Sequence, residues 1–370
     1  MTTRDKQVEA QQKVISGEAW RDFCDLLKSA GQLVIDNSEA DELERAEGFR
    51  YLARLTMNNL GSMDPASLNP PTIDYGGARI GADNPDFMYG KVRVTGAARY
   101  RITGKINDVF TFNIGAFHGQ LGTQQGLQSS GFLPASALQL DEEGSFAIIA
   151  SCDKPEEEGV DWLQMVPETN SFLVRQTILQ PGIDEPAEID VRVIDGDVST
   201  EPRALTAERL DQSLGRTAMM LHGIVQQFLG WTNDFKKRPN TISEINPELL
   251  GMAKGDPNCQ YNYGYFDLAD DEVLCISLQP PECEYWNIQL ANHWMESFDT
   301  SDAVSAINLA SAVMKDDGSC DIIVSATDPG KPNWLDTQFH QRGTIALRWV
   351  GAESKQADPL VRVCAIAELD

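Results

Sequence analysis

Short β-type segments joined by turns, with no helix between them, constrain the fold of this 370-residue chain more than any other feature. Apolar and polar side chains alternate along them, as in strands that bury one face. Parallel strands would need a crossover helix between neighbours, and the connections here carry turn residues instead. The series therefore predicts a mainly β fold, an antiparallel, jelly-roll-like β-sandwich. The segments are residues 91–95, 99–103, 109–118, 145–151, 172–179 and 188–194, then 261–268, 272–278, 284–294, 308–315, 320–326, 344–349 and 360–367.

Two helical regions accompany these strands. Residues 17–62 place apolar side chains at 3- and 4-residue spacing, which predicts an N-terminal helical hairpin broken at Gly31, with its second helix starting near Ser38. A helix-period stripe follows Thr206, a plausible N-cap, and predicts one long inserted helix. No internal repeat is visible. We therefore expect a helical region at 1–64 and one jelly-roll-like domain at 65–370, with the inserted helix at about 206–236.

The charge and cysteine content limit the classes of binding partner and the cellular compartment that we expect. The chain carries 30 Lys and Arg against 56 Asp and Glu, a net charge of −26, which repels nucleic acid and anionic membranes. Seven scattered cysteines, with no CxxC pair, predict a reducing cytoplasm rather than a disulfide framework. The N-terminus has no apolar signal-peptide core, and no apolar stretch reaches 18 residues. We expect a small-molecule ligand, no nucleic acid and no membrane; a homo-oligomer is left open.

The chain has no standard catalytic motif. It lacks a GxSxG elbow, a Walker A loop, HExxH, and GxGxxG after a strand; residues 119–122 (GQLG) are too weak a match to bind phosphate. The four histidines are not at metal-ligand spacing of one another. We therefore expect no cofactor and no metal, although a metal held from distant strands stays open.

The segment 284–294 separates apolar from polar side chains. Trp286, Ile288, Leu290 and Trp294 share the face expected to pack on the sandwich core; Tyr285, Asn287, Gln289 and His293 share the other. The second face has amides and an imidazole but no Lys or Glu, so it either lines a wet cavity or is an ordinary exposed or interface face. His118 ends the segment 109–118. Alternation along this segment places its side chain on the face expected to point to the core or to a pocket mouth.

The loop between segments 320–326 and 344–349 concentrates functional side chains. Asp336 and His340 are close enough in sequence to form a general base with an orienting carboxylate. Alternatively, Asn333 and Trp334 form a structural plug with a bonded indole. Arg101 and Arg348, each in mid-strand, are expected either to pair with a buried carboxylate or to clamp an anion.

Four sequence stretches carry a family resemblance. EGFRYLARL (47–55), the segment 83–106, DPGKPNWLDT (328–337) and LRW (347–349) resemble the bacterial "domain of unknown function" family twelve-fourteen. The resemblance covers residue 47 to the C-terminus and implies a jelly-roll-like sheet. Family members with a companion domain have two such sandwiches with helical excursions, and the short helical N-terminal part here departs from that pattern. The resemblance implies no reaction.

Two functional hypotheses follow. The first is a cofactor-independent catabolic enzyme, a hydrolase or a lyase, that binds a bulky apolar molecule between the sandwich and the helices and uses acid–base catalysis. The second is a non-catalytic protein that binds a ligand, a glycan or a partner chain. Convergence of His and Asp side chains on one cavity would favour the enzyme. In the first hypothesis His118, His293 and His340 transfer protons, Asp336 orients, Asn333 and Arg348 polarise, Trp286 and Trp334 form walls, and Asn287 and Arg101 contact substrate.

Overall fold

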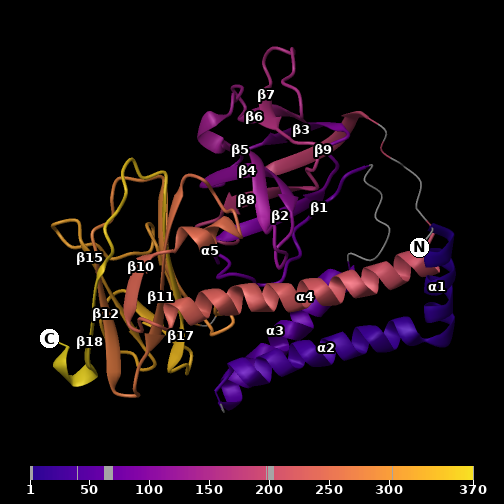
Figure 1. The fold of residues 1–370 in the computed structure, drawn as a ribbon. Helices are drawn as coiled ribbons and strands as arrows, with labels where there is room; N and C mark the ends of the chain where they lie inside the picture. Colours follow the sequence, from indigo (N-terminus) through magenta and orange to yellow (C-terminus); the bar gives the residue numbers. More distant parts are fainter. Residues whose placement is uncertain are drawn as a thin grey trace.

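The computed structural model describes residues 3–39, 41–61, 70–196, 198, 204–301 and 303–369. Strands form two bodies, and most of the helices lie along one side of them (Figure 1). The predicted fold class is confirmed: mainly β, antiparallel and sandwich-like, with an N-terminal helical hairpin and one long inserted helix. The Pro-, Gly- and Asn-rich sequence of 65–85 predicts a loop, and its residues 65–69 lie outside the described ranges.

The predicted hairpin is the pair α2 and α3. Gly31 does not break α2, because Phe49 of α3 packs over it, 3.9 Å from where a Cβ would lie. That contact offsets the cost of a helical glycine, about 1 kcal/mol. The second helix starts after Asp41, whose Oδ1 accepts from Glu44 N at 2.9 Å, and Ser38 instead ends α2. The helices are α1 (Thr3–Ser16), α2 (Glu18–Asn37), α3 (Glu42–Gly61), α4 (Ala207–Phe235) and α5 (Pro247–Gly251).

The long helix α4 begins as its sequence predicts. Thr206 Oγ1 accepts from Arg209 N at 3.3 Å and caps the helix. The helix runs beside α2 along the lower side of the molecule and ends at the second β body (Figure 1). Its apolar stripe packs with α2, α3 and strand residues in one core, which includes Val34, Leu55 and Trp294. The helices are therefore part of the core of the second body rather than a separate domain.

The first β-sandwich precedes α4. A five-stranded sheet in the order β1-β2-β8-β4-β5 packs on a four-stranded sheet in the order β7-β6-β3-β9. Both sheets contribute to one hydrophobic cluster, with Phe172 and Ile148 at its centre. The strands are β1 (Ile73–Asp74), β2 (Phe87–Arg93), β3 (Arg99–Lys105), β4 (Thr111–Gly119), β5 (Leu127–Pro134), β6 (Ser145–Ser151), β7 (Asp161–Gln164), β8 (Ser171–Thr177) and β9 (Glu188–Asp195).

The second β-sandwich follows α4. Its sheets have the orders β10-β11-β17-β13-β14 and β16-β15-β12-β18. They enclose a separate cluster that includes Trp286, Leu335 and Leu347. The strands are β10 (Thr241–Glu244), β11 (Cys259–Asp267), β12 (Glu272–Leu278), β13 (Tyr285–Ala291), β14 (Ala306–Asn308), β15 (Cys320–Ser325), β16 (Trp334–Asp336), β17 (Arg342–Val350) and β18 (Leu360–Ala365).

The two sandwiches have the same topology, so the absence of an internal repeat, inferred from the sequence, is wrong. Adding nine to every strand number of the first sandwich gives the strand orders of the second, including its one parallel pair (β6–β7 and β15–β16). Helices precede strand β1, and helix α4 precedes strand β10. The sequence analysis placed one sandwich in 65–370, whereas the sheets there form two pairs, one on each side of α4.

Local contacts repeat as well. Trp162 Nε1 donates to Ser151 O at 3.1 Å, and Trp334 Nε1 donates to Ser325 O at 3.1 Å. Each tryptophan stands one residue before a buried leucine in the parallel strand of its sandwich. A motif that occurs at equivalent places in both halves serves the fold of each half. The structural-plug interpretation of Trp334 therefore fits its contacts.

Candidate functional site

The two sandwiches meet through a buried polar layer that we call the seam. On one side, Tyr89, Arg175 and Asn113 lie opposite one another on β2, β8 and β4. On the other side, Tyr261, Arg348 and Asn287 lie opposite one another on β11, β17 and β13. These two rows occupy equivalent positions in the repeat. The contact between the halves thus has approximate two-fold symmetry.

Each half of the seam bonds to the other. Asn113 Nδ2 donates to Asp256 Oδ2 at 3.2 Å, and Asn287 Nδ2 donates to Asn84 Oδ1 at 3.1 Å. The backbone N–H groups of Asp256 and Asn84 in turn donate to the hydroxyls of Tyr261 and Tyr89, both at 3.0 Å. Because buried polar groups need partners, these reciprocal bonds fix the docking of the sandwiches.

Arg348 is the most buried cation of the seam. Its guanidinium donates to Gln289 Oε1 at 2.7 Å, to Asn287 Oδ1 at 3.4 Å and to Ala82 O. Within the described ranges no carboxylate lies within 4.0 Å of it, so the expected carboxylate partner is not observed. Burial acts to lower the pKa of Arg348, but neighbouring ionisable groups, Tyr263 foremost, raise it. Arg348 therefore remains a cation held by neutral oxygens.

The expectation that Asn287 and His293 share the wall of a wet cavity is not met. Strand β13 ends at Ala291, so His293 and Trp294 leave the strand and contact the helices. Asn287 is buried in the seam and forms hydrogen bonds with neighbouring side chains. A cavity of about 10 Å³, enough for about one water, lies nearby between the two halves. It is lined by residues that include Thr111, Asn113, Asp256 and Tyr285.

Both ring nitrogens of His293 are already engaged. Nδ1 lies 3.1 Å from Tyr265 Oη and Nε2 lies 3.1 Å from Asn37 O. Burial, followed by the charge of Lys236, lowers the pKa of His293 to about 4. The neutral ring therefore donates to the carbonyl of Asn37 and accepts from Tyr265. It has no free nitrogen for a substrate proton.

His340 pairs with a carboxylate other than the predicted one. Its Nε2 lies 2.9 Å from Glu47 Oε2 and its Nδ1 lies 2.8 Å from Thr337 O. Burial acts to lower the pKa of His340, but the hydrogen bond and charge of Glu47 outweigh it and the pKa is raised. The stabilisation from this pair is fully present below the unfolded pKa, about 6.5, and is lost as pH rises through the folded pKa.

The Glu47–His340 pair belongs to a chain of charges that joins α3 to the second sandwich. Arg50 Nη2 lies 2.8 Å from Glu47 Oε1 and 3.5 Å from Glu296 Oε2, and Arg54 Nη1 lies 2.7 Å from Glu296 Oε1. The side chain of Glu296 is buried, with 1% exposed. Each side chain in this series is paired with a charge of opposite sign. The series therefore clamps α3 to the second sandwich.

The remaining predicted residues of the 326–343 loop hold the loop itself. Asp336 Oδ1 accepts from Gln338 N at 2.7 Å, so it does not orient His340. Asn333, with a positive φ of 56°, accepts from Val313 N at 2.7 Å and donates to Val313 O at 2.8 Å. Asn333 therefore stabilises the loop, and its amide is not free to polarise a substrate.

Two further predicted residues lie away from any hollow. Trp286 is buried in the core of the second sandwich, with its ring 5.8 Å from that of Trp349. Arg101 is a surface residue that binds both carboxylate oxygens of Glu157 at 2.7 Å. Neither is placed to contact a substrate with the histidines.

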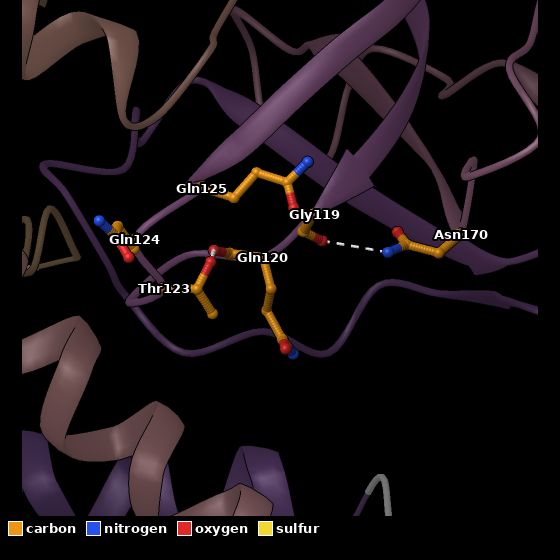
Figure 2. Close-up of a pocket in the computed structure, with 6 residues that line it drawn as sticks. All are labelled: Gly119, Gln120, Thr123, Gln124, Gln125 and Asn170. Atoms are coloured by element: carbon orange, nitrogen blue, oxygen red, sulfur yellow. Dashed lines mark hydrogen bonds between the residues drawn. The ribbon is translucent and has the colours of Figure 1, made fainter.

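A hollow lies at the end of β4, far in sequence from the predicted loop. It has a volume of about 630 Å³ and opens to the surface (Figure 2). The lining contains amides and one hydroxyl and no charged group. The amide of Asn170 donates to Gly119 O at 3.1 Å, whereas the side-chain amides of Gln124 and Gln125 have no partner within the described part of the chain. The lining residues are Gly119, Gln120, Thr123, Gln124, Gln125 and Asn170.

Glycines shape the loop that forms this hollow. Gly119, Gly122 and Gly126 all have φ between 67° and 75°, a conformation that other residues rarely adopt. A Cβ on Gly122 would lie 2.4 Å from Ile224 N of α4, so the loop lies directly against that helix. Gln120 N donates to Gly126 O at 2.9 Å and closes the turn. The loop is therefore held rigidly with its amides exposed.

His118 stands next to this loop and differs from the other two predicted histidines. Its Nδ1 is buried and has no hydrogen-bond partner in the described ranges. It lies in the first sandwich, whereas His293 and His340 contact α2, α3 and strand residues of the second. The three histidines do not converge on one cavity.

The sequence analysis missed Gln124, Gln125 and Asn170. A signal is present: glycines at 119, 122 and 126 flank four polar residues, directly after a strand segment that ends in His118. That stretch had been tested only as a phosphate loop. No group of three or more His, Cys, Asp or Glu side chains in the described part of the chain is arranged to hold a metal. No helix there is long and apolar enough to cross a bilayer.

The burial of His293 gives a pH dependence. Between pH 6.5 and about 4 the unfolded chain takes up a proton at His293 that the folded protein excludes, so the free energy of unfolding should fall by about 3 kcal/mol as the pH falls. Urea titrations across this range would compare the protein with a His293→Gln variant. As the pH falls, the free energy of unfolding of the wild-type protein should fall relative to that of the variant. A constant difference would show that His293 is not buried as a neutral ring.

The chain is similar to a family of proteins of unknown function and to a solved structure that shares its architecture. A family model described as "Protein of unknown function (DUF1214)" matches residues 267–354. The crystal structure of an uncharacterised protein from Burkholderia cenocepacia is 36% identical, covering 97% of this chain and 99% of that chain, with a TM-score of 0.88. The VPA0106 protein from Vibrio parahaemolyticus is 12% identical, covering 76% of this chain and 90% of that chain, with a TM-score of 0.47. No curated protein matches the chain.

Proposed function

The chain belongs to the DUF1214 family of proteins of unknown function, and we propose that it binds a small, neutral, hydroxyl-bearing molecule in the hollow beside β4. The observation that carries the proposal is the pair of unengaged amides of Gln124 and Gln125 in its lining. An amide offers both a donor and an acceptor, which suits the hydroxyl groups of a sugar or polyol. The volume, about 630 Å³, is in the range of small-molecule sites.

The repeat supplies a second argument. In the second sandwich, the first part of the equivalent loop, residues 292–298, is buried and is covered by α3, as Trp294 and Glu296 illustrate. In the first sandwich, the loop after β4 is only partly covered by α4, and Gln124 and Gln125 remain exposed. A position that one half fills with protein is thus open in the other. An open position with unused donors and acceptors is suited to a ligand.

Charge favours a neutral ligand. The lining has no Lys or Arg to pair with a phosphate or carboxylate, and the net charge of −26 repels anions. It also has no Asp or Glu to bind a cation directly. This is the non-catalytic alternative of the two sequence-based hypotheses, with the ligand class made specific.

A hydrolase or lyase acting on the same ligand is the second candidate. One observation favours it: His118 directly precedes Gly119 of the hollow, and its buried Nδ1 has no partner in the described ranges. An unengaged imidazole nitrogen, once turned toward the hollow, can accept a proton from a bound hydroxyl. A His118→Asn variant that still binds ligand but loses turnover would support this candidate.

The test is a binding titration with a panel of neutral sugars and polyols beside sugar acids and sugar phosphates. We expect at least one neutral compound to bind, and a Gln124→Ala variant to weaken its binding about fivefold, as for one lost neutral hydrogen bond. Gln180→Ala is the matched control. Asn170 directly precedes β8, whereas Gln180 lies beyond the other end of that strand. It should leave the affinity unchanged.

Three results would contradict the proposal. They are binding of the anionic compounds alone, equal effects of the two Gln variants, and an absence of binding across the panel. If a peptide co-purified with the protein and protected the loop from proteolysis, the hollow would be a partner-binding surface instead.

A further inference from the structure

We propose that Cys275 and Cys364 form a reversible disulfide that ties the C-terminal strand to the second sandwich. Their sulfur atoms lie 3.8 Å apart in the reduced protein, already in van der Waals contact. All seven cysteines of the chain are free thiols in the structure, and within the described ranges this pair has its two sulfur atoms in contact. The inference does not depend on the proposed ligand site.

The position of the two residues allows the bond to form. Cys275 is on β12 and Cys364 on β18, and these strands are antiparallel neighbours with Val273 opposite Cys364 and Arg362 opposite Cys275. The thiols therefore lie diagonally across one strand pair, on one face. A disulfide needs the sulfurs at about 2.05 Å, so they must approach by less than 2 Å.

Strand β18 is able to make that movement. It is at the edge of its sheet, where its one partner within the described ranges is β12, and a short 3-10 turn follows it. The two thiols belong to a small apolar cluster with Val273, Ile323 and Leu369, separate from the main core. A shift of an edge strand over a small cluster does not disturb the packed centre of the sandwich.

The chemistry is thiol–disulfide exchange with a small-molecule disulfide such as oxidised glutathione. The thiolate of one cysteine attacks the glutathione disulfide and releases one glutathione thiolate, giving a mixed disulfide. The second cysteine's thiolate then attacks the protein sulfur of that bond and releases the second glutathione. Two protein thiols are oxidised by two electrons, the glutathione disulfide is reduced to two thiols, and the two protons pass to the departing thiolates.

The environment sets the rate of this reaction. Burial first, and the neighbouring thiol of Cys364 second, raise the pKa of Cys275 to about 11; Asp321 adds to the rise and Arg362 opposes it. The reactive thiolate is then a small fraction at neutral pH and grows about tenfold per pH unit below the pKa. Oxidation should accelerate about tenfold between pH 7 and 8.

The experiment treats the full-length protein with oxidised glutathione, follows free thiols, and maps linked peptides by mass spectrometry without reduction. We expect the loss of two thiols, a peptide linkage between Cys275 and Cys364, and a rise in Tm of a few degrees, because the bond closes a long loop. Cys275→Ser should leave Cys364 as a mixed disulfide with glutathione. Cys152→Ser, in the first sandwich, should leave the linkage intact.

Other products would overturn the proposal. If both thiols persist when Cys152 is oxidised, the pair is shielded and does not react. If the wild-type protein accumulates the mixed disulfide, the second thiol cannot reach the first. A linkage between any other two cysteines would assign the reactivity elsewhere.

Discussion

Replacing Arg348 by alanine is expected to lower the free energy of unfolding by about 3–5 kcal/mol, the largest effect of any single substitution in the seam. The guanidinium satisfies three buried oxygens, those of Gln289, Asn287 and Ala82. Its removal leaves Asn287 Oδ1 and Ala82 O without a donor, whereas Gln289 Oε1 keeps the bond from Asn287 Nδ2, and each unsatisfied buried group costs about 1–3 kcal/mol. Denaturant titrations followed by circular dichroism measure the change.

Arg101→Ala is the control for this experiment. Both arginines lie in mid-strand, but Arg101 forms an exposed ion pair with Glu157, and such pairs contribute about 0–1 kcal/mol. The expected contrast is therefore a difference of several kcal/mol between two arginines that the sequence does not distinguish. Similar losses in the two variants would mean that the seam is hydrated and that Arg348 is not structurally essential.

Replacing Trp294 by alanine is expected to lower the free energy of unfolding by a similar amount, about 3–5 kcal/mol. The ring is 2% exposed, packs against α3 at Gly48, and donates from Nε1 to Glu44 O at 2.8 Å. Truncation opens a cavity between α3 and the second sandwich and removes the indole bond to the Glu44 carbonyl. Limited proteolysis should then cut α3 first, because Trp294 joins α3 to the loop after β13.

Trp20→Ala is the matched control. Trp20 lies on α2 and is 58% exposed, so its loss should cost well under 1 kcal/mol. If Trp294→Ala were as mild as Trp20→Ala, α3 would be held by its other core contacts and by the charged series of Glu47, Arg50, Arg54 and Glu296. The Trp294 result therefore also measures how the apolar and ionic contributions to helix docking are divided.

The repeat explains why the most family-specific sequence motif gave no active site. The segment around Trp334 has an equivalent around Trp162, with the same indole bond to a strand carbonyl. The repeat itself could not be read from the sequence, because its equivalent residues are about 170 positions apart and only a few, such as Tyr89 and Tyr261, share an identity.

The histidine predictions show where sequence proximity fails. Asp336 lies four residues from His340, yet the carboxylate at its ring is Glu47, 293 positions away. His293 was assigned to a strand face by alternation, but the strand ends at Ala291. In both cases the partner is a helix from the N-terminal region, and the docking of that helix determines the protonation of the ring.

Strand alternation with turn residues predicts the sandwich fold, and the stripe after Thr206 predicts the long helix, because burial of one face imposes its period on the chain. The presence of two sandwiches, the binding of Arg348 to neutral oxygens, and the open hollow next to the loop after His118 became visible in the folded protein. These features depend on contacts between segments distant in sequence. Periodicity records which face of a segment is buried, but not which surface buries it.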